Sequence, residues 1–157
     1  MRNVAVTLWL VVTLTACSSV ARVGARAPGF DEETAQGTML SMGALAGKPV
    51  WLNFFATWCP PCNEEAPAVQ SVADEFKPKG LQVIGIDVLE NAAKAKAFTS
   101  EHHLRFPAVV DTGALRDAYN INGMPVNVFI DKDGIIRDIE IGQLERSDMV
   151  ADVKKIL

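Results

Sequence analysis

Cysteine and histidine are scarce in this chain of 157 residues, which has three cysteines and two histidines. A structural zinc site needs four ligands, and there is no second cysteine pair to complete one. The histidines, His102 and His103, are adjacent at the end of a predicted helix, and we expect both to face solvent. We therefore predict no metal site.

Lysine- or arginine-rich stretches are also missing, and the formal net charge is −4. A nucleic-acid partner is not expected, because no basic segment is available to neutralise phosphates. The sequence contains no internal repeat and no low-complexity tract. With 49% hydrophobic and 22% charged residues, the composition is that of one globular domain with its own core.

No apolar run near the N-terminus is long enough for a transmembrane helix, which needs roughly 17 to 25 apolar residues. The run at 4–14 follows Arg2 and is typical of an export signal. Leu-Thr-Ala-Cys at 14–17 resembles the lipobox of bacterial lipoproteins, which implies a lipid on Cys17. The alternative is a soluble secreted protein cut within 25–27; either reading places the mature protein outside the cytoplasm.

These features divide the chain into a signal peptide at 1–16, a lipidated N-terminus and tether at 17–27, and one domain at 28–157. Lipidation removes Cys17 from the count of thiols in an oxidising compartment. Cys59 and Cys62 then remain for redox chemistry.

These two cysteines lie between a predicted strand and a predicted helix. Residues 50–55 are apolar on both faces, as in a central strand, and apolar residues recur every three or four positions over 60–76. The N-terminus of a helix favours a thiolate, so Cys59 is the candidate nucleophile. Cys62 lies one turn on and can attack the mixed disulfide that Cys59 forms.

Pro60 and Pro61 lack a backbone N–H, so the first amide able to reach the Cys59 sulfur is that of Cys62. Fewer donors stabilise the thiolate less, and an oxidant of this kind is one whose reduced form is unusually stable. The two prolines therefore favour a reductant.

The rest of the pattern predicts an α/β fold with a mixed central sheet and helices on both faces. The turn Asp-Lys-Asp-Gly at 131–134 indicates a hairpin, and Pro67 should kink the first long helix. Ser147 is the predicted cap of a last helix ending near Ile156. The other predicted elements are strands at 38–40, 81–88, 126–130 and 135–141, a helical turn at 41–46, and helices at 92–102 and 114–119.

A buried strand, Trp-Cys-x-x-Cys, a proline five residues later and Gly-Met-Pro before a strand together resemble the thioredoxin fold. Over 24–157 the finer resemblance is to the TlpA/ResA-like extracytoplasmic thiol-disulfide oxidoreductases. It implies a thioredoxin-like fold and no cofactor, because the dithiol itself stores the electrons. The segments that carry it are 47–49, 52–62, 106–111 and 129–134.

The resemblance also implies how substrate is bound. Pro125 is expected to follow a cis peptide bond and to present the backbone of Met124 to a substrate strand; the alternative is an ordinary turn proline with a trans bond. Trp58 should pack beside the disulfide and shield it, and Pro60 and Pro61 complete the expected substrate-binding residues.

Asn53 occupies the position where thioredoxin has a buried acid, and an amide cannot accept the proton of Cys62. Glu90 matches an acidic residue that the family holds near its active site. In a partly apolar setting its pKa would be raised, which suits a group that assists deprotonation of Cys62. The alternative is a solvated loop glutamate.

The expected function is reduction of disulfides in exported proteins, for example in cytochrome c or oxidase maturation. The resemblance implies a membrane thiol-electron donor, and the lipid would anchor the protein to a bacterial membrane. Four alternatives stay open: a copper(I) delivery protein using the same two thiolates, a disulfide oxidant, a peroxidase, and a redox-inert adaptor for unfolded chains.

Overall fold

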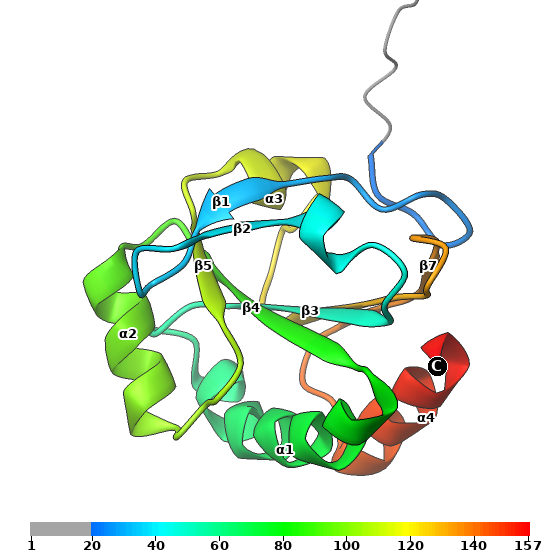
Figure 1. The fold of residues 1–157 in the computed structure, drawn as a ribbon. Coiled ribbons are helices and arrows are strands. Elements are labelled where there is room, and N and C mark those ends of the chain that lie inside the picture. Colours follow the sequence, from blue (N-terminus) through cyan, green and yellow to red (C-terminus); the bar gives the residue numbers. More distant parts are fainter. Residues whose placement is uncertain (1–19) are drawn as a thin grey trace, which may run out of the picture.

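The computed structural model describes residues 20–157 and is built around a five-stranded sheet with the order β5-β4-β3-β6-β7 (Figure 1). Strands β3, β4 and β5 are parallel, whereas β6 runs antiparallel to both β3 and β7. Strand β3 lies in the centre and all six of its residues are buried. The strands are β3 (Val50–Phe55), β4 (Gln82–Val88), β5 (Ala108–Asp111), β6 (Val126–Ile130) and β7 (Ile136–Ile141).

Helices cover both faces of this sheet, as Figure 1 shows. One face carries α1 (Pro60–Phe76) and α4 (Arg146–Ile156), whose apolar side chains pack on Trp51 and Phe129. Helix α2 (Ala92–Glu101) joins the same layer through Phe98. The other face packs against α3 (Ala114–Ala118) and the N-terminal segment. That segment holds β1 (Asp31–Glu33), β2 (Met39–Ser41) and the 3-10 turn η1 (Met42–Leu45); a second turn, η2 (Lys77–Lys79), follows α1.

The predicted mixed α/β sheet is confirmed, and β3 and α1 have the predicted bounds. Strands β1 and β5 were not predicted. Strand β1 consists of three acidic residues, which are uncommon in strands, and β5 has four residues, too few to display a periodicity. The turn that follows β1 is bonded to β5, since the backbone N–H of Ala35 donates to the carbonyl of Ala108 at 2.8 Å. None of the helices in the described part is long and apolar enough to cross a membrane.

The predicted cap of the last helix is wrong. Helix α4 begins at Arg146, and its N-cap is Glu145, in an extended conformation with φ −73° and ψ 151°. No side chain caps this helix, and Ser147 lies inside its first turn. The helix starts earlier because the carbonyl of Glu145 already accepts the backbone N–H groups of Asp148 and Met149.

The predicted tether at 17–27 is also too long. From Ala21 onward the chain is bonded to the domain: its N–H donates to the carbonyl of Ala118 at 3.0 Å, and that of Gly24 donates to Ile136 at 2.8 Å. The folded domain therefore includes most of the segment that we expected to be a spacer. The signal peptide and Cys17 lie outside the described residues.

Gly85, in the middle of β4, allows close packing beneath the active-site layer. A Cβ atom there would lie 3.0 Å from Phe55 Cε1 and 3.4 Å from Ala108 Cβ. We predict that Gly85→Ala lowers the free energy of unfolding by about 1–3 kcal/mol, measured by urea denaturation. Gly29→Ala, where a Cβ meets no atom within 4 Å, is the matched control. Equal stability of the two variants would contradict this packing argument.

Candidate active site

The two cysteines meet at the N-terminus of α1, where their sulfur atoms form a disulfide with a Cα–Cα distance of 5.3 Å. Each cysteine is only 3% exposed. Cys59 is the N-cap residue of the helix, and the backbone N–H of Cys62 donates to its sulfur at 3.3 Å. This N–H is the first one available after the two prolines, as predicted. The same N–H is placed to stabilise a Cys59 thiolate when the disulfide opens.

Glu90 holds the loop that leads into Cys59. Its carboxylate accepts the backbone N–H of Thr57 at 2.6 Å and the Thr57 hydroxyl at 2.8 Å. Lys94, one turn into α2, forms an ion pair with it at 2.8 Å. Only 3% of the Glu90 side chain is exposed, so the alternative of a solvated loop glutamate is wrong.

The expected raised pKa of Glu90 is also wrong. Burial by itself would raise the pKa, but the hydrogen bonds from Lys94 and Thr57 prevail and lower it below the ordinary value. Glu90 is therefore an ionised anchor for the loop rather than a group poised to take a proton. Its hydrogen-bond partners are Thr57 and Lys94, not Cys62.

Asn63 fixes the same loop from the helix side. Its side-chain amide donates to the carbonyl of Cys59 at 2.8 Å and to that of Thr57 at 3.1 Å. His102 hydrogen-bonds the Asn63 side-chain oxygen at 2.9 Å and packs against Phe98 with ring centroids 4.5 Å apart. His102 is thus half-buried, which corrects the prediction that it faces solvent.

A buried polar network anchors α1 to the sheet behind the dithiol. Glu65, 2% exposed, accepts the side-chain amides of Asn53 at 2.9 Å and Asn127 at 3.1 Å, and the backbone N–H of Leu144 at 2.9 Å. Asn127 in turn accepts the indole N–H of Trp51 at 2.8 Å. Burial raises the pKa of Glu65, and these hydrogen bonds offset part of that effect. The position of Asn53 is therefore structural, as part of this network.

The Met124–Pro125 peptide bond is cis, which confirms the expectation for this proline. Pro125 is buried, whereas Met124 lines a groove of ≈ 510 Å³ that opens beside Cys59. Trp58 is 67% exposed and lines the groove together with Cys59. The lining residues are Trp58, Cys59, Pro60, Pro61, Val88, Leu89, Arg116, Ile121, Asn122, Gly123 and Met124.

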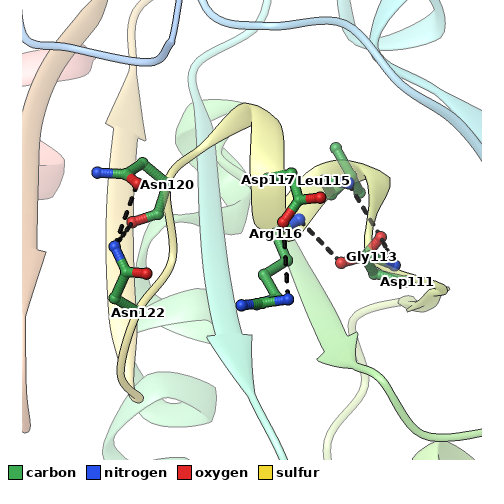
Figure 2. Close-up of polar contacts among 7 residues, drawn as sticks. All are labelled: Asp111, Gly113, Leu115, Arg116, Asp117, Asn120 and Asn122. Atoms are coloured by element: carbon green, nitrogen blue, oxygen red, sulfur yellow. Dashed lines mark hydrogen bonds and ion pairs between the residues drawn. The ribbon is translucent and has the colours of Figure 1, made fainter.

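Arg116, which lines the groove, lies in α3, and the turn that starts this helix is held by Asp111 (Figure 2). The Asp111 carboxylate accepts the backbone N–H groups of Gly113, Leu115 and Arg116, each at 2.9 Å. Asp111 ends β5, so the sheet directly fixes the short helix that contributes Arg116 to the groove.

Two further residues at the site were not predicted. Leu89 lines the groove with its side chain 56% exposed and its backbone at φ 57°, a region that leucine seldom adopts. Asp87 is completely buried in β4. A carboxylate inside an otherwise apolar strand was the one available signal for Asp87, and nothing in the sequence marks the backbone of Leu89.

Comparison with known proteins agrees with this geometry. Residues 23–139 match the model of the AhpC/TSA family. Thiol-disulfide oxidoreductase ResA of Bacillus anthracis is 32% identical over 136 residues, which cover 86% of this chain and 79% of that protein.

Solved structures agree as well. A thioredoxin-family thiol:disulfide interchange protein of Chlorobium tepidum has a TM-score of 0.78 at 31% identity, covering 88% of this chain and 99% of that one. A secreted disulfide oxidoreductase of Mycobacterium tuberculosis, described as homologous to Escherichia coli DsbE, has a TM-score of 0.73 at 27% identity, covering 80% and 95%. The chain belongs to the AhpC/TSA family of thioredoxin-like proteins, and within it to the thiol-disulfide oxidoreductases.

Glu90→Gln tests the loop anchor. The Glu90 carboxylate uses both of its oxygens to accept from Thr57 and Lys94, whereas a glutamine amide has only one acceptor oxygen. We therefore predict that the variant loses about 1.5–3 kcal/mol of its free energy of unfolding. Because the pKa of Glu90 is lowered in the folded protein, this stabilisation is present above pH 4.5 and is lost as pH falls through the folded-state value. Urea denaturation at pH 7 and at acid pH measures both effects.

The same variant should slow resolution of a mixed disulfide by roughly tenfold or more, because the loop no longer fixes the Cys59 sulfur. Stopped-flow measurement on the reduced protein gives this rate. Glu64→Gln, an exposed glutamate of α1, is the control. An unchanged rate and pH profile in Glu90→Gln would exclude a role for this carboxylate in the reaction.

Proposed function

We propose that this protein reduces disulfides in exported proteins, with Cys59 as the attacking thiol and Cys62 as the resolving thiol. The observation that carries the proposal is the Cys62 N–H aimed at the Cys59 sulfur, in a dithiol that opens onto a groove beside the cis Met124–Pro125 bond. One helix terminus thereby supplies both the stabilised nucleophile and its partner.

The reaction balances with the dithiol alone. The Cys59 thiolate attacks one sulfur of the substrate disulfide and displaces the other as a thiolate, which takes a proton from solvent. Cys62 then releases its proton to solvent, and its thiolate attacks the Cys59 sulfur of the mixed disulfide. The second substrate thiolate leaves, and the Cys59–Cys62 disulfide seen in the structure is formed.

The direction rests on the small number of donors at the nucleophile. Because Pro60 and Pro61 occupy the first turn, the hydrogen bond that the Cys59 sulfur accepts there comes from Cys62. A modestly stabilised thiolate makes the reduced form a good electron donor. Each turnover leaves the protein oxidised, so a membrane thiol-electron donor is proposed to recharge it.

The proposed location is outside the cytoplasm, with a lipid on Cys17 as the membrane anchor. The lipobox-like sequence at 14–17 supports this location, as does the secreted M. tuberculosis relative. Because the chain is bonded to the domain from Ala21 onward, only 18–20 would separate lipid from fold. The domain would therefore work close to the bilayer, on substrates such as proteins of cytochrome c or oxidase maturation.

Cysteine variants test the two thiol roles separately. Cys62→Ser should accumulate a mixed disulfide with an oxidised substrate peptide, because no resolving thiol is present. Cys59→Ser should form no mixed disulfide through Cys62, and its rate of disulfide reduction should fall to the uncatalysed background. Intact-mass measurement after alkylation detects the adduct. A stable adduct in Cys59→Ser but not in Cys62→Ser would reverse the roles, and peptide binding without any adduct in either would favour the adaptor.

Leu89 tests the groove as the substrate-binding surface. A left-handed backbone costs a non-glycine residue about 1–2 kcal/mol, so Leu89→Gly should not destabilise the fold and should raise its stability by up to about 1 kcal/mol. It removes apolar area from the groove beside Cys59. We therefore predict a raised KM, with kcat little changed, for disulfide peptides with apolar residues next to cysteine.

Steady-state reduction of such peptides, compared with peptides that carry only polar neighbours, measures this preference. Met39→Gly, which removes another exposed apolar side chain, is the control for loss of surface hydrophobicity. Equal KM values for both peptide classes in Leu89→Gly and in the wild-type protein would exclude Leu89 from substrate binding.

A further inference from the structure

Asp87 is a buried acid that the reaction described above does not use. It is 0% exposed, and neither of its carboxyl oxygens accepts a hydrogen bond within residues 20–157. It pairs with Phe55 in the parallel register of β3 and β4, so both side chains lie on one face of the sheet. Phe55 belongs to the same buried cluster as Cys59 and Cys62. Asp87 therefore lies in the sheet layer beneath the dithiol.

An ionised carboxylate that accepts no hydrogen bond would be strongly unfavourable in such a place, because no donor replaces its lost hydration. Its acidic neighbour Glu90 is in the opposite situation, since Thr57 and Lys94 satisfy its charge. Burial first, then the Glu90 charge and a hydrogen bond of the protonated acid with the Glu90 carboxylate raise the pKa of Asp87 to about 8, and the Lys94 charge opposes them. The pKa of Glu90 is lowered. At neutral pH the two acids thus carry one proton, on Asp87.

The other titratable groups on the elements around β4 either have hydrogen-bond partners of their own or are exposed to solvent. Glu65 of α1 is held by its network of amides, and Asp111 of β5 by the backbone of α3. His102, at the end of α2, is bonded to Asn63, and β3 contains no charged residue. Lys96 and Glu101 of α2 are exposed. Glu90 and Lys94 are therefore the groups of the described residues whose charge bears on Asp87 in the oxidised protein.

We propose that Asp87 and Glu90 form one proton-holding pair whose proton is coupled to the redox state of the Cys59–Cys62 dithiol. Asp87 is a positioning residue in this scheme: as a neutral acid, it leaves Glu90 as the one charged anchor of the Cys59 loop. The proposal deepens the proposed function and rests on it, because it takes the dithiol as the redox centre.

The coupling has a definite proton balance. When Asp87 is ionised, two electrons from a thiol donor reduce the disulfide to a Cys59 thiolate and a Cys62 thiol. The new thiolate charge favours return of a proton to Asp87, so two protons are taken up, one by Cys62 and one by Asp87. At lower pH, Asp87 already holds its proton and contributes none.

The first test is the pH dependence of the reduction potential of the full chain, measured in dithiothreitol buffers from pH 6 to 10. The wild-type curve should bend near pH 8, where Asp87 ionises in the oxidised protein. Asp87→Asn, which mimics the neutral acid, should lose the part of this bend that Asp87 contributes and keep only the bends that come from the two thiols. Asp74→Asn, a surface acid paired with Arg105, should keep it. Identical curves for the wild-type protein and Asp87→Asn would overturn the coupling.

The second test observes the proton directly. Infrared difference spectra of the oxidised protein, titrated upward from pH 6, should show the carbonyl band of one protonated carboxyl that disappears near pH 8. The band should be missing in Asp87→Asn and present in Asp74→Asn. If Asp87→Asn does not fold, the wild-type titration alone is the test. Absence of the carbonyl band from the wild-type spectrum at pH 6 would overturn the proposal that Asp87 holds the proton of the pair.

The two readouts separate the possible failures. If the dithiol forms no reversible disulfide, the proposed function fails whatever the infrared spectrum shows, and the coupling fails with it. If the disulfide is reversible and the band is present but the potential curve has no bend, only the coupling fails.

Discussion

The site depends on one hydrogen bond, from the backbone N–H of Cys62 to the sulfur of Cys59. This bond requires the chain to leave β3, turn, and enter α1 with Cys59 as the N-cap. It also requires α1 to keep its position on the sheet. That position is fixed by packing and by Glu65, which bonds α1 to β3, β6 and the turn before α4.

The charges around the dithiol are divided between two acids with opposite environments. Glu90 has its hydrogen bonds satisfied by Thr57 and Lys94 and stays ionised, so it can hold the loop. Asp87 accepts no such hydrogen bonds in the described part of the chain, and burial and the neighbouring Glu90 carboxylate raise its pKa. If both were ionised, two negative charges would lie close to a centre that must itself form a thiolate. Keeping one acid neutral limits this repulsion.

Sequence patterns predicted the centre of the molecule well and its edges poorly. Residues 50–55 and 60–76 gave clear signals because a buried central strand and a long amphipathic helix each repeat one pattern over many residues. Strand β5 was missed because four residues cannot show a repeat, and the segment after Ala21 looked like a spacer because its backbone bonds leave no side-chain pattern.

The dithiol and the cis-proline were predicted because their residue types carry the chemistry. The pKa of an acid could not be predicted in the same way, because it depends on neighbours that are distant in the sequence. Glu90 was expected to be the group with the raised pKa, but its hydrogen bonds come from Thr57, on another loop. The isolation of Asp87 depends likewise on which side chains the neighbouring strands place beside it.

The reduction potential of the Cys59–Cys62 pair at pH 7 is the most direct test of a dithiol that works as a reductant. It can be measured by equilibrating the full chain in dithiothreitol or glutathione buffers and following tryptophan fluorescence. A value near or below about −220 mV is predicted, because a single helix N–H stabilises the Cys59 thiolate only modestly. A value near −120 mV, typical of a strong oxidant, would contradict this account.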